Sequence, residues 1–387
     1  MLCTFFPTLY SAHQTTSCYA FFLFPPSKWP KTWVKVIAAS GWVIAAIGFF
    51  GNYSGLKVFS NDVVAKLAFE IDKNAVYVPL TSSETFVPRD DLENRVNNAL
   101  TRQESQRCYH VIFGPKGVGK SAIVDKCAKG RRGVIKVVVT DSNTKKDVVG
   151  SVLRQLGYPS SDTNIDSEML LKAVQLCKHK PILIFDIERG GGATVNSDAI
   201  QAVRSMAKVC AATCVCVIIL SEASAVVEFG KDRSREEFLY VNEMTHEEGK
   251  QLLRSRGASF SERQLDYIFH NIGTSPAMLE KLMYKVPLDV TLEQFVEEEM
   301  REARKDLQEF SHQPILDALK KHPDGVSLDA FLGVQDDGAK LWKPREVARA
   351  MVDSNAIVYR METDQYQLMS TAHRTALLKT FKPLAKE

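Results

Sequence analysis

The feature that most constrains this chain is a glycine-rich loop between a short apolar strand and a helix. The strand is predicted over Tyr109–Phe113, and a helical pattern begins at Ala122. Between them every fixed position of the pattern G-x-x-x-x-G-K-[ST] is matched, by Gly114-Pro115-Lys116-Gly117-Val118-Gly119-Lys120-Ser121. A flanking strand and helix distinguish such a loop from an accidental glycine-rich turn. The sequence therefore predicts a phosphate-binding loop.

Each residue type in the loop has a chemical task. The glycines let the backbone curl, so that successive N–H groups and the helix N-terminus point at the β- and γ-phosphates of a nucleotide. Lys120 adds a positive charge to the same phosphates, and the Ser121 hydroxyl can complete the shell of a Mg²⁺ ion. We therefore expect ATP and Mg²⁺ as ligands.

A nucleotide site also needs a carboxylate on a neighbouring strand. Residues 181–186 are apolar until the segment ends in Asp186, which is typical of a central parallel strand whose carboxyl end faces the ligand. Asp186 is predicted to hold Mg²⁺ through water, and Glu188 is the candidate that polarises the attacking water. Most P-loop enzymes that hydrolyse ATP place the second acid directly after the first. Here that position is Ile187, so Mg²⁺ binding is better supported than fast hydrolysis.

Three further strands complete the predicted fold class, an α/β domain with a five-stranded, mostly parallel P-loop NTPase sheet. These strands are predicted over residues 133–140, 214–220 and 237–241. They alternate with helical stretches near residues 145–156, 167–178 and 197–210.

Polar residues beside two of these strands are weaker candidates for the site. Ser221 follows the fourth strand, where it can sense the γ-phosphate or position water; a cap of a helix or turn is an equal alternative. Arg233 and Arg235 precede the fifth strand and are candidates to reach a phosphate in this subunit or a neighbour. The alternative is that both are solvated surface arginines.

Segments before and after the sheet resemble the archaeal-type and STAND-class ATPases of the AAA+ group. Residues 85–93, which include Arg89, resemble the segment that precedes the nucleotide-binding sheet in that group. Residues 241–249 resemble the start of its helical lid, and residues 272–279 resemble its "G-x-P" element. There Ser275 can cap a helix that Pro276 opens, with the helix N-terminus aimed at the nucleotide. The resemblance covers about residues 80–380 and adds Arg89 and Pro276 to the predicted nucleotide contacts.

The C-terminal segment looks like the winged helix that closes such ATPases. Helices are predicted at residues 314–320, 328–332 and 344–354, and a hairpin pairs residues 356–360 with 366–369. Residues 308–387 hold 11 basic and 11 acidic side chains, which leaves no basic stripe for phosphate attraction. A contact within the chain or with a protein is therefore favoured over DNA binding, which stays open.

The N-terminal arm carries the whole excess of positive charge. Residues 1–61 contain four lysines and no acid, whereas the other 326 residues hold 45 basic and 46 acidic side chains. Residues 33–53 approach the length of a bilayer span, interrupted only by Lys35; a buried helix or a segment removed by processing is the alternative. The positive-inside rule would place the bulk of the chain across the membrane, away from ATP. This conflict disappears if the arm is an import signal ahead of a mitochondrial inner-membrane anchor, although it lacks the arginines that such signals usually carry. It also disappears if the chain is cytoplasmic.

The cysteines favour a reducing compartment, because most of them lie in apolar runs and not in a regularly spaced framework. Cys214 and Cys216 share one face of a strand. No second ligand pair with zinc spacing accompanies them, so buried structural thiols are favoured over a metal site.

Together these features predict an N-terminal segment (residues 1–60), a P-loop ATPase domain (80–242), a helical lid (243–307) and a winged helix (308–387). The leading hypothesis is a regulatory ATPase in which bound ATP sets an arrangement that a protein partner, or a second copy of the chain, reads. The alternatives are a DNA-associated ATPase and a scaffold that binds ATP without hydrolysing it.

Overall fold

The computed structural model describes fourteen stretches of the chain, and all structural statements concern them. They are residues 62–73, 76–79, 86–101, 107–140, 145–156, 167–188, 197–220, 235–286, 290–309, 313–322, 325–327, 356–360, 363 and 365–380. The chain divides into two units, residues 1–63 and 64–387, and the second holds every element named below. The predicted membrane segment 33–53 lies outside the described residues. Among the described helices, none combines the length and apolar character that a bilayer span requires.

The second unit is built on a five-stranded sheet in which every neighbouring pair is parallel. The strand order is β2-β3-β4-β1-β5. The strands are β1 Tyr109–Phe113, β2 Val134–Val139, β3 Ile182–Ile187, β4 Val215–Leu220 and β5 Glu236–Tyr240. This confirms the predicted α/β sheet, with strand ends one residue from the expected positions at several places. Strands β3 and β4 are buried along their whole length, which fits their apolar sequences, in which Asp186 is the one charged residue.

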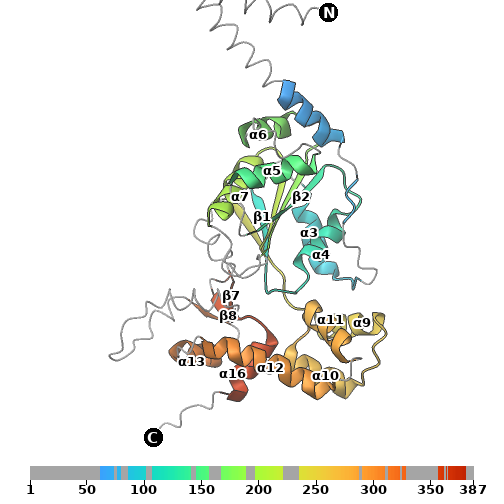
Figure 1. Ribbon diagram of the computed structural model, residues 1–387, viewed down its shortest axis with the longest axis vertical. Coiled ribbons are helices and arrows are strands. Elements are labelled where there is room, and N and C mark those ends of the chain that lie inside the picture. Colours follow the sequence, from blue (N-terminus) through green and yellow to red (C-terminus); the bar gives the residue numbers. More distant parts are fainter. Residues whose placement is uncertain are drawn as a thin grey trace, which may run out of the picture. The chain divides into compact units, whose positions relative to one another are not determined.

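Helices cover both faces of this sheet (Figure 1). They are α3 Asp90–Ala99, α4 Lys120–Ala128, α5 Lys145–Gln155, α6 Ser167–Leu176 and α7 Ser197–Cys210. On one face, Val96 of α3 and Val124 of α4 pack against Ile112, Ile184 and Val217 of the strands. Helix α4 is therefore fixed directly over the strands whose carboxyl ends carry the candidate site.

Four helices follow the sheet in the region predicted as the lid. They are α9 His246–Ser255, α10 Glu262–Ile272, α11 Pro276–Lys285 and α12 Leu292–Glu309. Capping boxes start α9 at Thr245 and α10 at Ser261, because each hydroxyl accepts from the third helical N–H and a Glu or Gln side chain accepts in return. A separate core joins α10, α11 and α12 through Phe269, Leu279 and Phe295.

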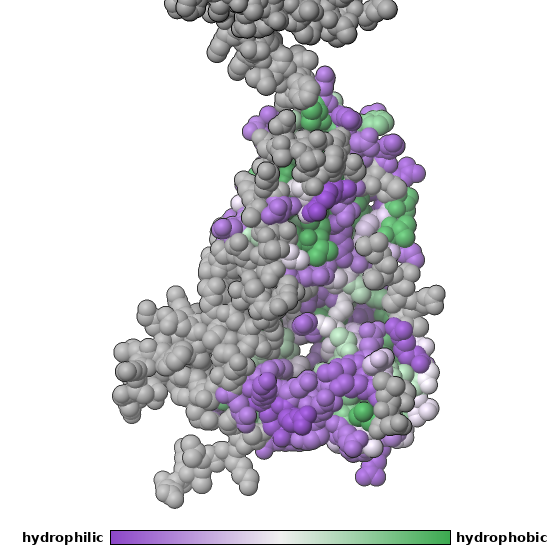
Figure 2. Space-filling model, in the orientation of Figure 1, coloured by the Kyte–Doolittle hydropathy of each residue, from purple (hydrophilic) through white to green (hydrophobic). Residues whose placement is uncertain are grey.

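The outer face of these helices is polar. Figure 2 shows hydrophilic residues gathered over α10 and α12. Ion pairs join Lys281 and Lys285 of α11 to Glu299 and Glu298 of α12, at 2.6 and 2.8 Å. Helices α11 and α12 are therefore joined by ion pairs as well as by apolar contacts.

The C-terminal part contains a small antiparallel sheet of order β6-β8-β7. Its elements are α13 Gln313–Lys321, β6 Val326–Ser327, β7 Ile357–Arg360, β8 Gln365–Leu368 and α16 Thr371–Thr380. The hairpin expected at residues 356–369 is present as β7 and β8. The helices expected at residues 328–332 and 344–354 lie outside the described residues, so the winged helix stays a prediction.

The sequence interpretation missed helix α16, which packs on lid helices α10 and α12. Thr375 donates to the carbonyl of His270 at 3.1 Å, and Lys379 donates to Asn271 at 2.8 Å. The His373 ring lies 3.3 Å from the Asp306 carboxylate. Helix α16 is therefore fastened to α10 and α12.

Candidate functional site

The predicted phosphate-binding loop joins β1 to α4, as the sequence pattern requires. Gly114, Gly117 and Gly119 all have positive φ angles, of 151°, 82° and 89°. Only glycine adopts such angles without strain. A Cβ atom at Gly114 would also lie 2.3 Å from the carbonyl oxygen of Val241. The loop therefore needs these glycines both for its curl and for its close approach to the end of β5.

Lys120 is buried inside this loop, with 4% of its surface exposed. Its ammonium donates to the carbonyls of Gly114 and Pro115, at 2.9 and 2.7 Å. Burial lowers the pKa of Lys120 to about 8, although the charge of Asp186 opposes this shift. A phosphate held by the loop would compete with these two carbonyls for the same ammonium.

Asp186 lies near the end of β3, in line with the loop. Its backbone is in register with Ile219 of β4, which is in register with Ile112 of β1. The residue is fully buried, and its Oδ1 atom accepts no hydrogen bond from a described residue. The ammonium of Lys136 lies 3.1 Å from Oδ2 of Asp186 and supplies the opposing charge.

Lys136 links Asp186 to a second buried carboxylate. Its ammonium donates to both oxygens of Asp125 on α4, at 2.9 and 3.0 Å, and the Tyr77 hydroxyl donates to the same group at 2.8 Å. Burial by itself would lower the pKa of Lys136, but the two carboxylates outweigh it and raise that pKa. The sequence interpretation missed this cluster. Its signal is the single charge within the apolar strand VIKVVV.

The donor set fits a Mg²⁺ ion. Such an ion prefers oxygen ligands. Oδ1 of Asp186 is buried without a hydrogen-bond donor among the described residues, and Ser121 stands directly after Lys120 at the start of α4. Lys136 already neutralises the charge of Asp186. The site that Ser121 and Asp186 would offer an ion is therefore less negative than an unpaired carboxylate would make it.

The remaining acid and hydroxyl candidates are less well placed. Glu188 lies just beyond β3 with an exposed side chain, and its backbone N–H donates to Val139 at 2.9 Å. Strand β3 ends at Ile187, but this bond continues the pairing with β2, and burial together with the charge of Asp186 raises the pKa of Glu188. The role of Glu188 stays a prediction. Ser221 and Arg233 lie outside the described residues.

Arg235 is exposed at the amino end of β5, where its carbonyl accepts from the N–H of Tyr109. The loop begins at the other end of β1, after Phe113. Strands β1 and β5 are parallel, and four residue steps of about 3.3 Å separate these ends. The structure does not bring Arg235 to the loop of its own chain.

Arg89 connects the loop to the segment that leads into helix α9. Its guanidinium donates to the carbonyl of Val118 at 3.3 Å and to those of Asn242 and Glu243 at 3.0 and 3.1 Å. Its Nε also lies 3.5 Å from Glu248 of α9. Arg89 therefore holds three backbone segments together at the site.

The N-terminus of helix α11 rests on the same loop. The Ser275 hydroxyl and the Ala277 N–H both donate to the carbonyl of Gly117, each at 3.1 Å. A Cβ atom at Gly117 would lie 2.7 Å from the Cβ of Ala277. Pro276 opens α11 as expected, but the Ser275 side chain does not cap the helix, because its hydroxyl bonds the loop instead.

Sequence comparison gives no relatives, whereas structural comparison identifies the fold. No family model matches the chain, and no curated protein matches it. The chain is similar to a Walker-type ATPase of Pyrococcus abyssi, with a TM-score of 0.51 and 14% identity, over 78% of this chain and 98% of that one.

Two further solved structures score lower. A STAND protein with a tetratricopeptide repeat sensor from Pyrococcus horikoshii has a TM-score of 0.37 and 15% identity, over 79% of this chain and 45% of that one. Aeropyrum pernix Orc1, solved in complex with DNA, has a TM-score of 0.39 and 13% identity, over 81% and 96%. The likeness with a TM-score above 0.5 concerns the fold alone, and it shows that the chain shares the fold of that Walker-type ATPase.

Proposed function

We propose that this chain binds and hydrolyses ATP and acts as a nucleotide-driven switch whose lid and C-terminal part contact a protein partner. The observation that carries the proposal is the double hydrogen bond from Ser275 and Ala277 to the Gly117 carbonyl. It joins the first turn of a lid helix to the centre of the phosphate-binding loop. A change in the loop's backbone therefore acts directly on the lid.

In the bound state, the loop's backbone N–H groups and the N-terminus of α4 hold the phosphate oxygens. Lys120 leaves the carbonyls of Gly114 and Pro115 and donates to the phosphates. Ser121 and Asp186 would hold Mg²⁺, which neutralises phosphate charge when it is bound. Glu188 is the available acid for orienting water, and its exposed position favours slow turnover.

The lid transmits such a change along contacts that are already in place. Helix α11 packs on α12 through Leu279 and Phe295, and ion pairs reinforce the contact. Helix α12 in turn packs against the C-terminal helix α16. A shift at Gly117 is thereby carried to the end of the chain, where we place the partner's binding surface.

The direct test measures ATP binding and ATP turnover for wild type, Lys120→Ala and Glu188→Gln. We expect Lys120→Ala to lose both, and Glu188→Gln to bind ATP but turn it over more slowly. Lys126→Ala is a matched control, because Lys126 lies on the same helix but pairs with Glu93 outside the loop. Binding without turnover in wild type would favour the scaffold, and a wild type that does not bind ATP would contradict the proposal.

Affinity for duplex DNA discriminates the second candidate function. The balanced charge of residues 308–387 predicts weak binding with a shallow dependence on salt concentration. A steep dependence would favour a DNA-associated ATPase instead.

The membrane location is a separate proposal that rests on the apolar run 33–53. Cell fractionation of the full-length chain and of a chain beginning at Asn61 tests it. The full-length chain is expected with organellar membranes, and the shortened one in the soluble fraction. An equal distribution of the two would contradict an N-terminal anchor.

A further inference from the structure

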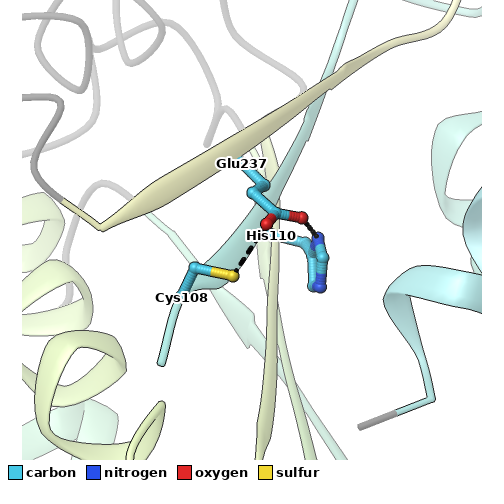
Figure 3. A group of neighbouring side chains, drawn as sticks. All are labelled: Cys108, His110 and Glu237. Carbon is cyan, nitrogen blue, oxygen red and sulfur yellow. Dashed lines mark hydrogen bonds and ion pairs between the residues drawn. The ribbon is translucent and has the colours of Figure 1, made fainter. Parts of the chain in front are cut away.

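Three side chains with metal-binding chemistry meet at the amino end of strands β1 and β5. Figure 3 shows Cys108, His110 and Glu237 pointing toward one another. The thiol of Cys108 lies 3.0 Å from one carboxylate oxygen of Glu237, and Nδ1 of His110 lies 3.3 Å from the other. One ligand atom from each residue falls within 4.8 Å of the others.

The strand geometry explains this convergence. Cys108 and His110 are two residues apart, so their side chains project from the same face of the sheet. His110 and Glu237 are direct partners in the parallel register of β1 and β5. Because the backbone of two paired strands is rigid, the three side chains are held close before any ligand arrives.

The donor set points to one class of ion. A thiolate with an imidazole and a carboxylate is a ligand set for Zn²⁺ and related transition metals, whereas Mg²⁺ and Ca²⁺ prefer oxygen alone. Ligand atoms around a tetrahedral Zn²⁺ ion lie about 3.3–3.6 Å apart, given the usual bond lengths. Cys108 and His110 lie 3.0 and 3.3 Å from different oxygens of Glu237, close to that spacing. The 4.8 Å limit over the three ligand atoms leaves at most about 1.5 Å of side-chain movement to reach it.

We propose that Cys108, His110 and Glu237 bind one Zn²⁺ ion, or a divalent transition-metal ion of similar chemistry, that clips β5 to β1. Binding releases the thiol proton of Cys108 to solvent, and water takes the fourth position. Glu237 has 47% of its side chain exposed, which leaves the ion a path to the cluster.

The bound ion would stabilise strand β5, which has one neighbour among the described strands of the sheet. In the part of the sheet that the structure describes, β5 lies at the edge and pairs with β1 alone. Beyond its far end, Val241 donates to the Phe113 carbonyl at 2.8 Å and packs against Gly114 of the phosphate-binding loop. A metal at the near end is therefore expected to stabilise the strand that supports the loop without entering the nucleotide site.

The test titrates the full-length, metal-free chain with Zn²⁺ and repeats the titration with Co²⁺. We expect one equivalent to bind, with a thiolate-to-cobalt charge-transfer band and visible bands of four-coordinate cobalt. Cys108→Ser, His110→Gln and Glu237→Gln should each weaken binding by more than about tenfold, the smallest loss that is typical of changes around a metal site. Cys108→Ser should also abolish the charge-transfer band.

Matched controls test whether binding belongs to this cluster. Cys177→Ser keeps a donor for the Ala173 carbonyl, His179→Gln changes an exposed ring, and Glu247→Gln changes an exposed acid. All three should bind Zn²⁺ like wild type. The same ion should raise the midpoint of thermal unfolding in wild type and not in Cys108→Ser.

Two results would overturn the proposal. One is wild-type protein that binds no Zn²⁺. The other is equal Zn²⁺ affinity in wild type and the three cluster variants, which would show adventitious binding elsewhere on the chain. Neither result bears on ATP binding, so the metal proposal and the proposed function fail independently.

Discussion

The two ends of strand β1 carry different candidate sites, and the residues of the two sites come together in different ways. At the carboxyl end, Gly114 to Ser121 follow one another directly, so that backbone N–H groups and one buried lysine form the site. At the amino end, Cys108 and Glu237 are 129 residues apart and meet only because β1 pairs with β5. The carboxyl end is buried and contacts the first turn of α11, whereas the amino end is partly exposed. The first end can therefore be recognised from a local pattern, and the second only from strand pairing.

The largest expected difference in the free energy of unfolding is between a variant of Lys136 and a variant at the amino end of β1. Lys136→Ala removes the ammonium that pairs with the buried carboxylates of both Asp125 and Asp186, so we expect the free energy of unfolding to fall by about 3–5 kcal/mol. Metal-free Glu237→Gln at the amino end should change it by about 1 kcal/mol or less, because its side chain is half exposed. Urea unfolding at neutral pH measures both. Equal losses would contradict the assignment of buried charge to the carboxyl end.

A smaller loss is expected for Gly117→Ala, with Gly130→Ala as its matched control. Both glycines have φ angles near 80°, so each substitution carries the left-handed penalty of about 1–2 kcal/mol. A Cβ atom at Gly117 also meets Ala277 of the lid, whereas at Gly130 nothing lies within 4 Å. We expect a further loss of about 1–3 kcal/mol for Gly117→Ala. Identical unfolding curves for the two variants would show that the lid does not press on the loop.

The pH dependence of ATP affinity tests the burial of Lys120. Its pKa is about 8 before binding, and phosphates favour the charged form, so binding above pH 8 must take up a proton. Affinity should therefore fall as pH rises through 8, approaching about tenfold per pH unit, or about 1.4 kcal/mol. Lys120→Arg remains charged and should lose this dependence. Calorimetric titration from pH 7 to 9 gives the result, and an unchanged pH profile in Lys120→Arg would assign the proton to another group.

The smallest effect is expected for Ser275→Ala, which removes one hydrogen bond to Gly117 and should cost about 1 kcal/mol of stability. Ser261→Ala, at the start of α10, should cost a similar amount through its lost helix cap. Only Ser275→Ala should change ATP affinity as well, because Ser261 makes no contact with the loop among the described bonds. An equal change in ATP affinity in both variants would mean that the loss of stability, and not the contact with Gly117, causes it.

Much of the fold could be predicted because its signals are local. The loop pattern, the apolar strand that ends in Asp186 and the proline that opens α11 each lie within about ten residues of sequence. Helix α16 was missed because its apolar positions are few and their periodicity is weak beside Thr371, His373 and Arg374.

The missed parts of the two sites depend on contacts between distant segments. Lys136 could be noticed as a charge in an apolar strand, but its partner Asp186 follows only from the pairing of β2 with β3. The same holds for Ser275, whose bond to Gly117 spans 158 residues and displaces the helix cap that local rules favour.

Hydrogen exchange at the first turn of α11, with and without ATP, tests the proposed switch most directly. The N–H of Ala277 bonds the Gly117 carbonyl, so its exchange rate reports the contact between lid and loop. We predict that ATP changes exchange at residues 275–279 in wild type and leaves it unchanged in Lys120→Ala. Unchanged exchange in wild-type protein that calorimetry shows to be saturated with ATP would contradict the switch.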